Sequence, residues 1–165
     1  MSRAFVTERD GESDAGLPDR PVSPHPNYVT PAGLAALHRQ AGGLQAERER
    51  LAATPEELSA RARLREVDRD LRWVAERIRG ALPVDPATQP RDEVRFGATV
   101  TLVDEDAVVR KVTIVGEDEA DPEAGKVSWM SPLARVLSGA HVDDTVRWKR
   151  PAGDLTLTVL EIEYH

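Results

Sequence analysis

Residues 30–82 read TPAGLAALHRQAGGLQAERERLAATPEELSARARLREVDRDLRWVAERIRGAL and contain two successive helical repeats. Thr30 and Pro31 form a helix start, because a threonine oxygen accepts from the free N–H groups of a first turn and proline lacks such an N–H. Apolar residues then recur at steps of three and four, the spacing of a coiled-coil seam. The seam positions are Leu34, Leu37, Ala41, Leu44, Arg48 and Leu51, with Arg48 as the charged member.

The second repeat begins at the segment Thr54-Pro55-Glu56-Glu57. Thr54 is expected to cap a helix with Pro55 in its first turn, and Glu57 stands three residues later, as a capping box requires. Because a link of two alanines precedes this segment, the two helices are expected to pair in antiparallel fashion. The sequence therefore predicts an antiparallel coiled-coil hairpin over residues 29–82. Its second seam consists of Leu64, Val67, Leu71, Val74, Ile78 and Leu82.

Prolines mark the segments on both sides of this hairpin. Residues 1–28 contain four prolines among small and acidic residues and show no periodicity, which predicts a disordered tail. Residues 83–92 contain three prolines and break the helical period, which predicts a linker. A separate domain is expected over residues 93–165.

This last domain alternates β-type runs with turns. Valine, threonine and aromatic residues favour strands over residues 94–103, 109–115, 126–128, 142–149 and 155–164. A short helix is expected over residues 132–138, with Ser131 as its N-cap and Gly139 at its end. Acidic residues crowd positions 118–123 without the spacing of a calcium loop, so a solvated loop is expected there. The chain is therefore predicted to be an α+β protein, with a helical hairpin followed by an antiparallel sheet and one short helix.

The composition excludes several classes of function. The 165 residues include no cysteine and four histidines scattered along the chain, so neither thiolate chemistry nor a metal motif is expected. Residues 83–165 contain 16 acidic and 9 basic residues, which opposes direct binding of this half to nucleic acid. No apolar run is long enough to cross a bilayer. We expect a cytoplasmic, monomeric protein that binds a protein partner and holds neither metal nor cofactor.

Several blocks of sequence stand out as motifs. They are residues 63–69 (RLREVDR), 96–100 (FGATV), 115–121 (VGEDEAD), 131–135 (SPLAR), 151–154 (PAGD) and 162–164 (IEY). Together these blocks resemble the bacterial GreA/GreB transcript-elongation factors, and the resemblance extends over about residues 28–164.

The resemblance implies a C-terminal domain of the FKBP-like fold that docks on RNA polymerase at the entrance of the secondary channel. The coiled coil would enter the channel, and nucleic acid would be met only through the polymerase complex. A helix start headed by proline presents a rigid apolar surface to a partner helix. The implied docking residues are Ser131, Pro132, Leu133, Ala134 and Arg135.

The hairpin tip departs from the family pattern. Cleavage-competent members carry an Asp-x-x-Glu-Asn pattern whose carboxylates complete the coordination of a second Mg²⁺ at the polymerase active centre. The tip here consists of Thr54, Pro55, Glu56 and Glu57, and each arm looks about two turns, or about 10 Å, shorter than the family's arms. This favours a polymerase-binding regulator that is not an enzyme, similar to Rnk-type relatives. A cleavage-stimulating factor that uses Glu56 and Glu57 stays open as an alternative.

Two further alternatives come from other classes of function. A peptidyl-prolyl isomerase would share the implied fold, but Phe96, Trp129, Trp148 and Tyr164 are too few to line an aromatic proline pocket. A coiled-coil dimerisation module would require the helical hairpin alone.

Overall fold

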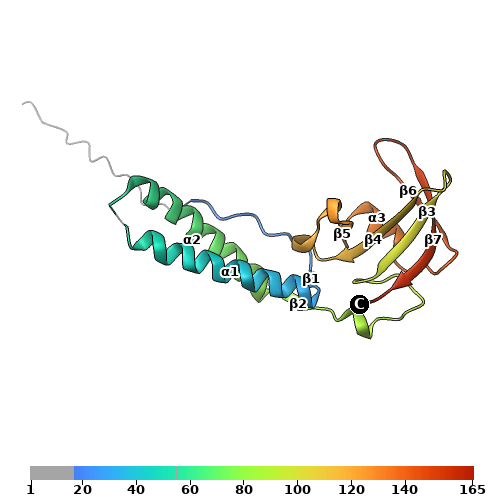
Figure 1. Cartoon of the computed structure of the whole chain (residues 1–165), viewed down its shortest axis with the longest axis horizontal. Coiled ribbons are helices and arrows are strands. Elements are labelled where there is room, and N and C mark those ends of the chain that lie inside the picture. The colour runs from blue at the N-terminus through green and yellow to red at the C-terminus, as the bar shows by residue number, and fades with distance from the viewer. Residues whose placement is uncertain (1–16, 55) are drawn as a thin grey trace, which may run out of the picture.

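A computed structural model describes residues 17–54 and 56–165 and arranges them in two parts (Figure 1). The first part is a hairpin of helices α1 (Pro31–Ala52) and α2 (Leu58–Arg79), each of 22 residues. The second part is a curved sheet at the base of the hairpin, and the hairpin projects away from this sheet. At 1.5 Å per residue each helix extends about 33 Å. The predicted α+β class is confirmed.

Apolar side chains between α1 and α2 hold the hairpin together. Leu37, Val67 and Val74 are buried in this seam, and Leu34 and Leu71 are half-buried beside them. Steps of three and four place these residues on one face of each helix, so the faces meet when the chain reverses direction. The predicted antiparallel pairing is confirmed.

The two helix starts differ in how well the sequence predicted them. Thr30 caps α1 as expected, because its Oγ1 accepts a hydrogen bond of 2.9 Å from the N–H of Gly33. α2 begins at Leu58, and among the described residues no side chain makes a capping hydrogen bond to its first turn. The predicted capping box of Thr54 and Glu57 is therefore wrong, and Pro55 lies outside the described residues. Thr54 and Glu57 lie instead where the chain reverses direction between α1 and α2.

Two predicted seam members lie outside the seam. Leu82 is 48% exposed and belongs to strand β2 (Ala81–Pro83), because α2 ends at Arg79. Arg48 is exposed on α1 and reaches Asp68 of α2 at 2.7 Å. A charged pair thus joins the two arms at this position. Among the described residues, no helix combines the length and the apolar character needed to cross a membrane.

The segment before α1 lies against the hairpin. Strand β1 (Asn27–Val29) pairs in parallel with β2, and residues 17–26 run along α2 (Figure 1). The predicted boundaries at residues 28 and 83 are therefore wrong, because the described end of the expected tail and the first residue of the expected linker join one small sheet. Composition did not signal this pairing, since its two strands lie at opposite ends of the hairpin sequence. The prediction for residues 1–16 lies outside the described residues.

Five strands form the larger sheet, in the order β5-β4-β3-β7-β6. β5 pairs in parallel with β4, so the sheet is mixed and the purely antiparallel prediction is wrong at this edge. The crossover of residues 116–125 returns the chain in the same direction. The elements are β3 (Thr99–Asp104), β4 (Val109–Val115), β5 (Lys126–Ser128), α3 (Pro132–Leu137), β6 (Thr145–Trp148) and β7 (Leu155–Glu163).

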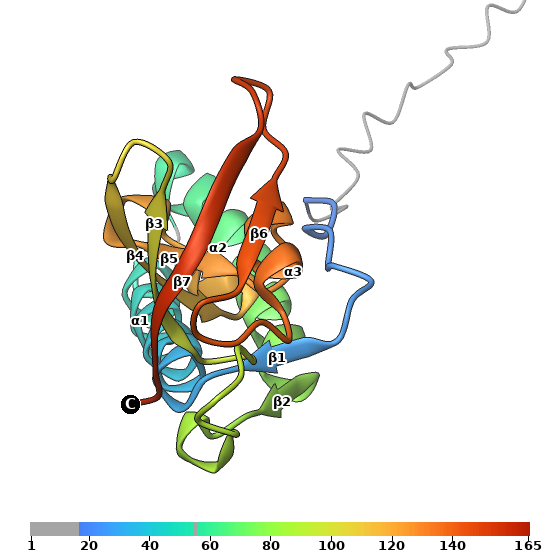
Figure 2. The same ribbon diagram turned by 90° about the vertical axis from the view of Figure 1, so that its right-hand side faces the viewer.

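The core of the sheet domain is aliphatic. Val100, Leu102, Leu157 and Val159 are fully buried, and Leu137 of α3 packs among them. A shift of register between Thr101 and Leu102 breaks the regular pairing of β3 with β7, and such irregularities bend a sheet. Figure 2 shows α3 beside β6, the strand at one edge of the sheet.

Tyr164 ties the last strand to the loop that enters the domain. Its hydroxyl donates to the carbonyl oxygen of Glu93 at 2.6 Å and accepts from the N–H of Arg95 at 2.8 Å. Burial raises the pKa of the Tyr164 phenol. The hydroxyl therefore stays protonated at neutral pH and can donate and accept at the same time.

We predict that Tyr164→Phe lowers the free energy of unfolding by about 1–3 kcal/mol, because it leaves a sheltered carbonyl and a sheltered N–H without a partner. Urea denaturation measures the effect. Tyr28→Phe is the control, because the Tyr28 hydroxyl makes no hydrogen bond within residues 17–54 and 56–165. Equal losses in the two variants would contradict the assigned role of the Tyr164 hydroxyl.

Candidate functional site

The tip of the hairpin carries two exposed carboxylates. Thr54, Glu56 and Glu57 connect the helices and are all exposed, and the adjacent Leu58 is 78% exposed. Glu57 is the N-cap residue of α2 through its backbone alone, and in the described part of the chain neither glutamate side chain forms a hydrogen bond or an ion pair. Both carboxylates are therefore available to a partner.

These carboxylates do not form a metal site by themselves. Within the described ranges, no three His, Cys, Asp or Glu side chains are grouped so that they could hold a metal ion. Mg²⁺ takes six oxygen ligands and keeps several waters. Two carboxylates at an exposed tip can therefore complete a coordination sphere that another molecule provides, but they cannot build one.

Ion pairs join the two arms below the tip. Arg63 of α2 donates to Glu47 of α1 at 2.7 Å and to Glu66 at 2.9 Å. The hydrogen bond from Arg63 lowers the pKa of the Glu47 carboxyl, and the two glutamates raise the pKa of Arg63. Because these groups are exposed, they contribute little stability, but they favour one register of the arms near the tip.

The predicted docking element is at the surface only in part. Ser131 caps α3, since its Oγ accepts from the N–H of Ala134 at 3.2 Å. Leu133 and Ala134 are 5% and 2% exposed and belong to the core of the sheet domain. Pro132 and Arg135 are exposed. The structure therefore leaves these two residues, and not the whole motif, to face a partner.

Val136 extends that surface and was missed in the sequence analysis. It is 36% exposed, and it follows Pro132 by four residues, so the two lie on one face of α3. A helix of six residues is too short for an apolar period to be recognised in the sequence. Pro132, Arg135 and Val136 are hereafter the α3 surface.

Residues 117–119 of the acidic loop join the hairpin to the sheet domain, so the expectation of a solvated loop is wrong for this part, whereas Asp121 and Glu123 are exposed. Gly116 lies under the backbone of Tyr28, where an added Cβ would stand 2.4 Å from the carbonyl oxygen of Tyr28. Glu119 accepts from the hydroxyl of Thr30 at 2.5 Å and from Lys126 at 3.4 Å. A local charge count could not reveal these contacts, because their partners lie far away in the sequence.

Arg77 occupies the centre of this junction and was also missed. Its side chain is 3% exposed and donates to Asp118 and to the side-chain oxygen of Asn27, both at 2.6 Å. The amide of Asn27 in turn donates to the carbonyl oxygen of Arg77 at 2.7 Å. Glu117 adds a second carboxylate at 4.0 Å. The sequence offers no signal for this role, since Arg77 is one of many arginines along α2.

Three aromatic rings from separate segments meet beside α3. The ring of Tyr28 lies 6.0 Å from that of Phe96 and 5.1 Å from that of Trp129, measured between centroids. With Ile114 they line a cavity of about 360 Å³. Trp148 instead packs against the core of the sheet domain. Tyr28 was not counted among the aromatic residues of this domain because it precedes the hairpin in the sequence.

We predict that Arg77→Leu lowers the free energy of unfolding by about 3–5 kcal/mol, because it leaves Asp118 and Asn27 without their partner in a sheltered place. Arg79→Leu is the matched control, since the Arg79 side chain is 74% exposed and its loss should cost less than about 0.5 kcal/mol. Chemical denaturation followed by circular dichroism gives both values. A similar loss in the two variants would show that the Arg77 contacts do not secure the junction.

Comparison with known proteins matches the sequence of this chain to transcription elongation factors. A family model described as "Transcription elongation factor, GreA/GreB, C-term" matches residues 89–164. The chain is 37% identical over 153 residues to transcription elongation factor GreB of Neisseria meningitidis serogroup B (strain ATCC BAA-335 / MC58), with 84% of this chain and 94% of the relative covered. It is 37% identical over 145 residues to transcription elongation factor GreA of Sphingopyxis alaskensis, with 80% and 92% covered.

Among solved structures, the prokaryotic transcription elongation factor GreA/GreB from Nitrosomonas europaea aligns at 22% identity with a TM-score of 0.42, and 84% of this chain and 99% of that chain are covered. The sequence relatives are the stronger finding, because they combine substantial identity with nearly full coverage of their own length. The chain belongs to the GreA/GreB family of transcription elongation factors.

Proposed function

We propose that this elongation factor binds RNA polymerase at the entrance of the secondary channel and occupies the channel with its hairpin without stimulating transcript cleavage. The sheet domain would dock, and the hairpin would reach inward. The observation that carries the proposal is the hairpin itself, two helices of 22 residues that end in a tip without the Asp-x-x-Glu-Asn pattern.

The length of the arms supports the absence of cleavage activity. The alignment with the Neisseria GreB extends over 153 residues, whereas 84% of this 165-residue chain is about 139 residues, so about 14 residues have no counterpart here. We assign these residues to the two arms of the hairpin, which would make each arm shorter by about 10 Å at 1.5 Å per residue. A carboxylate held that far from Mg²⁺ cannot ligate it at about 2.1 Å.

The α3 surface supports docking through the sheet domain. Pro132 and Val136 offer apolar contacts in fixed positions, and Arg135 adds a charge that suits an acidic partner helix. The residues behind this surface, Leu133 and Ala134, are packed in the core and keep it rigid. A preorganised surface loses little conformational entropy on binding.

The proposed partner, RNA polymerase, determines where this factor would act. The factor would act as a monomer in the cytoplasm, where RNA polymerase transcribes, and would meet nucleic acid only within the polymerase complex. A hairpin in the channel would exclude a cleavage factor by mass action, since the two would compete for one site.

A second candidate function is stimulation of transcript cleavage by the tip. It is favoured by Glu56 and Glu57, which are exposed and whose carboxylates make no hydrogen bond to the first turn of α2. If the hairpin enters more deeply than its length suggests, these carboxylates would complete the coordination of the polymerase Mg²⁺ and orient a water.

We predict that this protein suppresses RNA shortening in halted elongation complexes when a known cleavage factor is held at constant concentration. The RNA carries a 5′ label, and its length is measured as the protein is added in increasing amounts. Cleavage should fall about tenfold or more at saturation, because an occupied channel excludes the cleavage factor. The Glu56→Gln/Glu57→Gln variant is the matched control and should inhibit equally well. Faster shortening that this variant abolishes would establish the second candidate, and unchanged shortening would argue against docking at the channel.

We predict that Pro132→Glu weakens binding to core RNA polymerase about tenfold or more, because it places a charge at the centre of the α3 surface. Its thermal unfolding should stay close to that of the parent, since Pro132 is exposed. Val109→Glu, at a residue that is 59% exposed on another element, is the control and should bind normally. Undiminished binding by Pro132→Glu would remove α3 from the docking surface.

A further inference from the structure

Residues 17–26, hereafter the strap, lie along α2 as an extended segment (Figure 1). Four of these ten residues are proline. Proline holds its own φ angle and restricts the residue before it, so the segment is extended before it makes any contact. Ordering it on α2 therefore costs less conformational entropy than ordering an ordinary loop.

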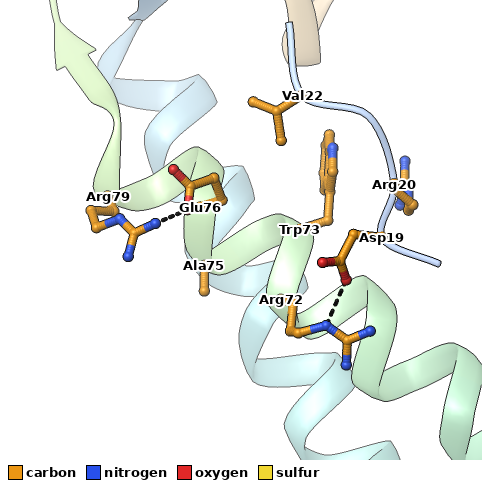
Figure 3. A pocket seen from close by; sticks show the side chains of 8 residues that line it. All are labelled: Asp19, Arg20, Val22, Arg72, Trp73, Ala75, Glu76 and Arg79. Atoms are coloured by element: carbon orange, nitrogen blue, oxygen red, sulfur yellow. Dashed lines mark hydrogen bonds and ion pairs between the residues drawn. The ribbon is translucent and has the colours of Figure 1, made fainter. Parts of the chain in front are cut away.

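One end of the strap is fastened to the middle of α2. Asp19 pairs with Arg72 at 2.7 Å, and the same guanidinium donates to the carbonyl oxygen of Leu17 at 3.3 Å. The guanidinium of Arg20 stands 4.1 Å from the ring centroid of Trp73. Figure 3 shows Asp19 against Arg72 and the strap passing the indole of Trp73.

The strap makes two further contacts with the same stretch of α2. The indole N–H of Trp73 donates to the carbonyl oxygen of Pro21 at 3.3 Å. Arg20 also approaches Asp70 at 3.5 Å. An aromatic ring with an N–H donor beside it is how proteins commonly hold proline-rich segments, since the carbonyl oxygens of such segments are free to accept.

The other end of the strap is fastened to the sheet domain. Ser23 donates to Glu117 at 3.1 Å. The strap then continues into β1, where Tyr28 packs on Gly116 and against the rings of Phe96 and Trp129. The strap is thus a bridge between the middle of α2 and the loop that follows β4.

The strap contacts α2 through a few side chains and is not packed against the helix along its whole length. A cavity of about 400 Å³ lies between it and α2, lined by Val22, Trp73, Glu76 and Arg79 among others (Figure 3). A second cavity of about 360 Å³ lies under residues 22–27. The strap is therefore held mainly by the hydrogen bonds and ion pairs described above and by the Arg20 guanidinium stacked on the Trp73 ring.

We propose that the strap sets the direction of the hairpin relative to the sheet domain by fastening α2 at a second point. At its first point, Arg77, the helix is joined to Asn27 and Asp118. This contact and that of Thr30 with Glu119 both lie at the base of the hairpin, about which the hairpin can pivot. An attachment at Arg72 and Trp73, about 7 Å farther along the axis of α2, removes that freedom. Release of the strap lets the hairpin sample other directions without unfolding either part.

Electron paramagnetic resonance distance measurements test this proposal on the full chain. Because the chain has no cysteine, spin labels can be placed at Ala62→Cys on α2 and Glu161→Cys on β7, two exposed positions. The strap is weakened by Asp19→Ala/Arg20→Ala. The matched control is Glu49→Ala/Arg50→Ala, which removes an exposed acid–base pair from α1 that does not touch the strap.

Release of the strap is followed separately through the indole N–H of Trp73, whose NMR signal is assigned by its loss in Trp73→Phe. In the strap variant we expect this N–H to exchange with solvent about tenfold faster and the distance distribution to widen about twofold. The control should leave both unchanged.

Two results would overturn the proposal. A faster indole exchange with an unchanged distance distribution would mean that the strap does not direct the hairpin. An unchanged indole exchange would mean that Asp19 and Arg20 do not hold the strap. The measurement uses no polymerase, so its outcome is independent of the proposed function.

Discussion

A guanidinium group cannot be buried alone, and Arg77 meets this constraint with partners from separate segments of the chain. Its side chain joins Asp118 of the loop after β4 and Asn27 of β1, while the amide of Asn27 returns a hydrogen bond to the Arg77 backbone. The end of α2, the start of the small sheet and the acidic loop are therefore held together by one charge. Movement of any of the three would leave that charge without a partner.

The two parts that meet at this junction present different functional groups. The sheet domain presents the α3 surface on a packed aliphatic core, and the hairpin carries Glu56 and Glu57 about 33 Å from its base. The α3 surface and the tip can contact one partner together only when the angle between the sheet domain and the hairpin is fixed. Arg77 and the strap define this angle at two points along α2, through a buried charge at one point and through a stacked guanidinium at the other.

The local signals in the sequence predicted most of the elements. Thr30 caps α1 and Ser131 caps α3 as expected, and the strands appear where β-branched residues alternate, because each of these features depends on neighbours within a few residues. The same local reasoning failed at Thr54, because this residue lies in the turn between α1 and α2 and does not cap α2. It failed again at the α3 motif, of which Leu133 and Ala134 are core residues, because an apolar residue reads alike whether it faces a partner or the interior.

Hydrophobic periodicity, caps and motifs in the sequence alone establish a helical hairpin followed by an α+β domain, a chain without thiol chemistry and membership of the GreA/GreB family. Contacts between distant residues establish the rest. β1 pairs in parallel with β2 across the whole length of the hairpin sequence. Arg77 and the strap likewise contact residues of the sheet domain that lie far from them in the sequence. No local pattern encodes such contacts, because a charge, a proline or an aromatic ring acquires its partner only when the fold brings the two together.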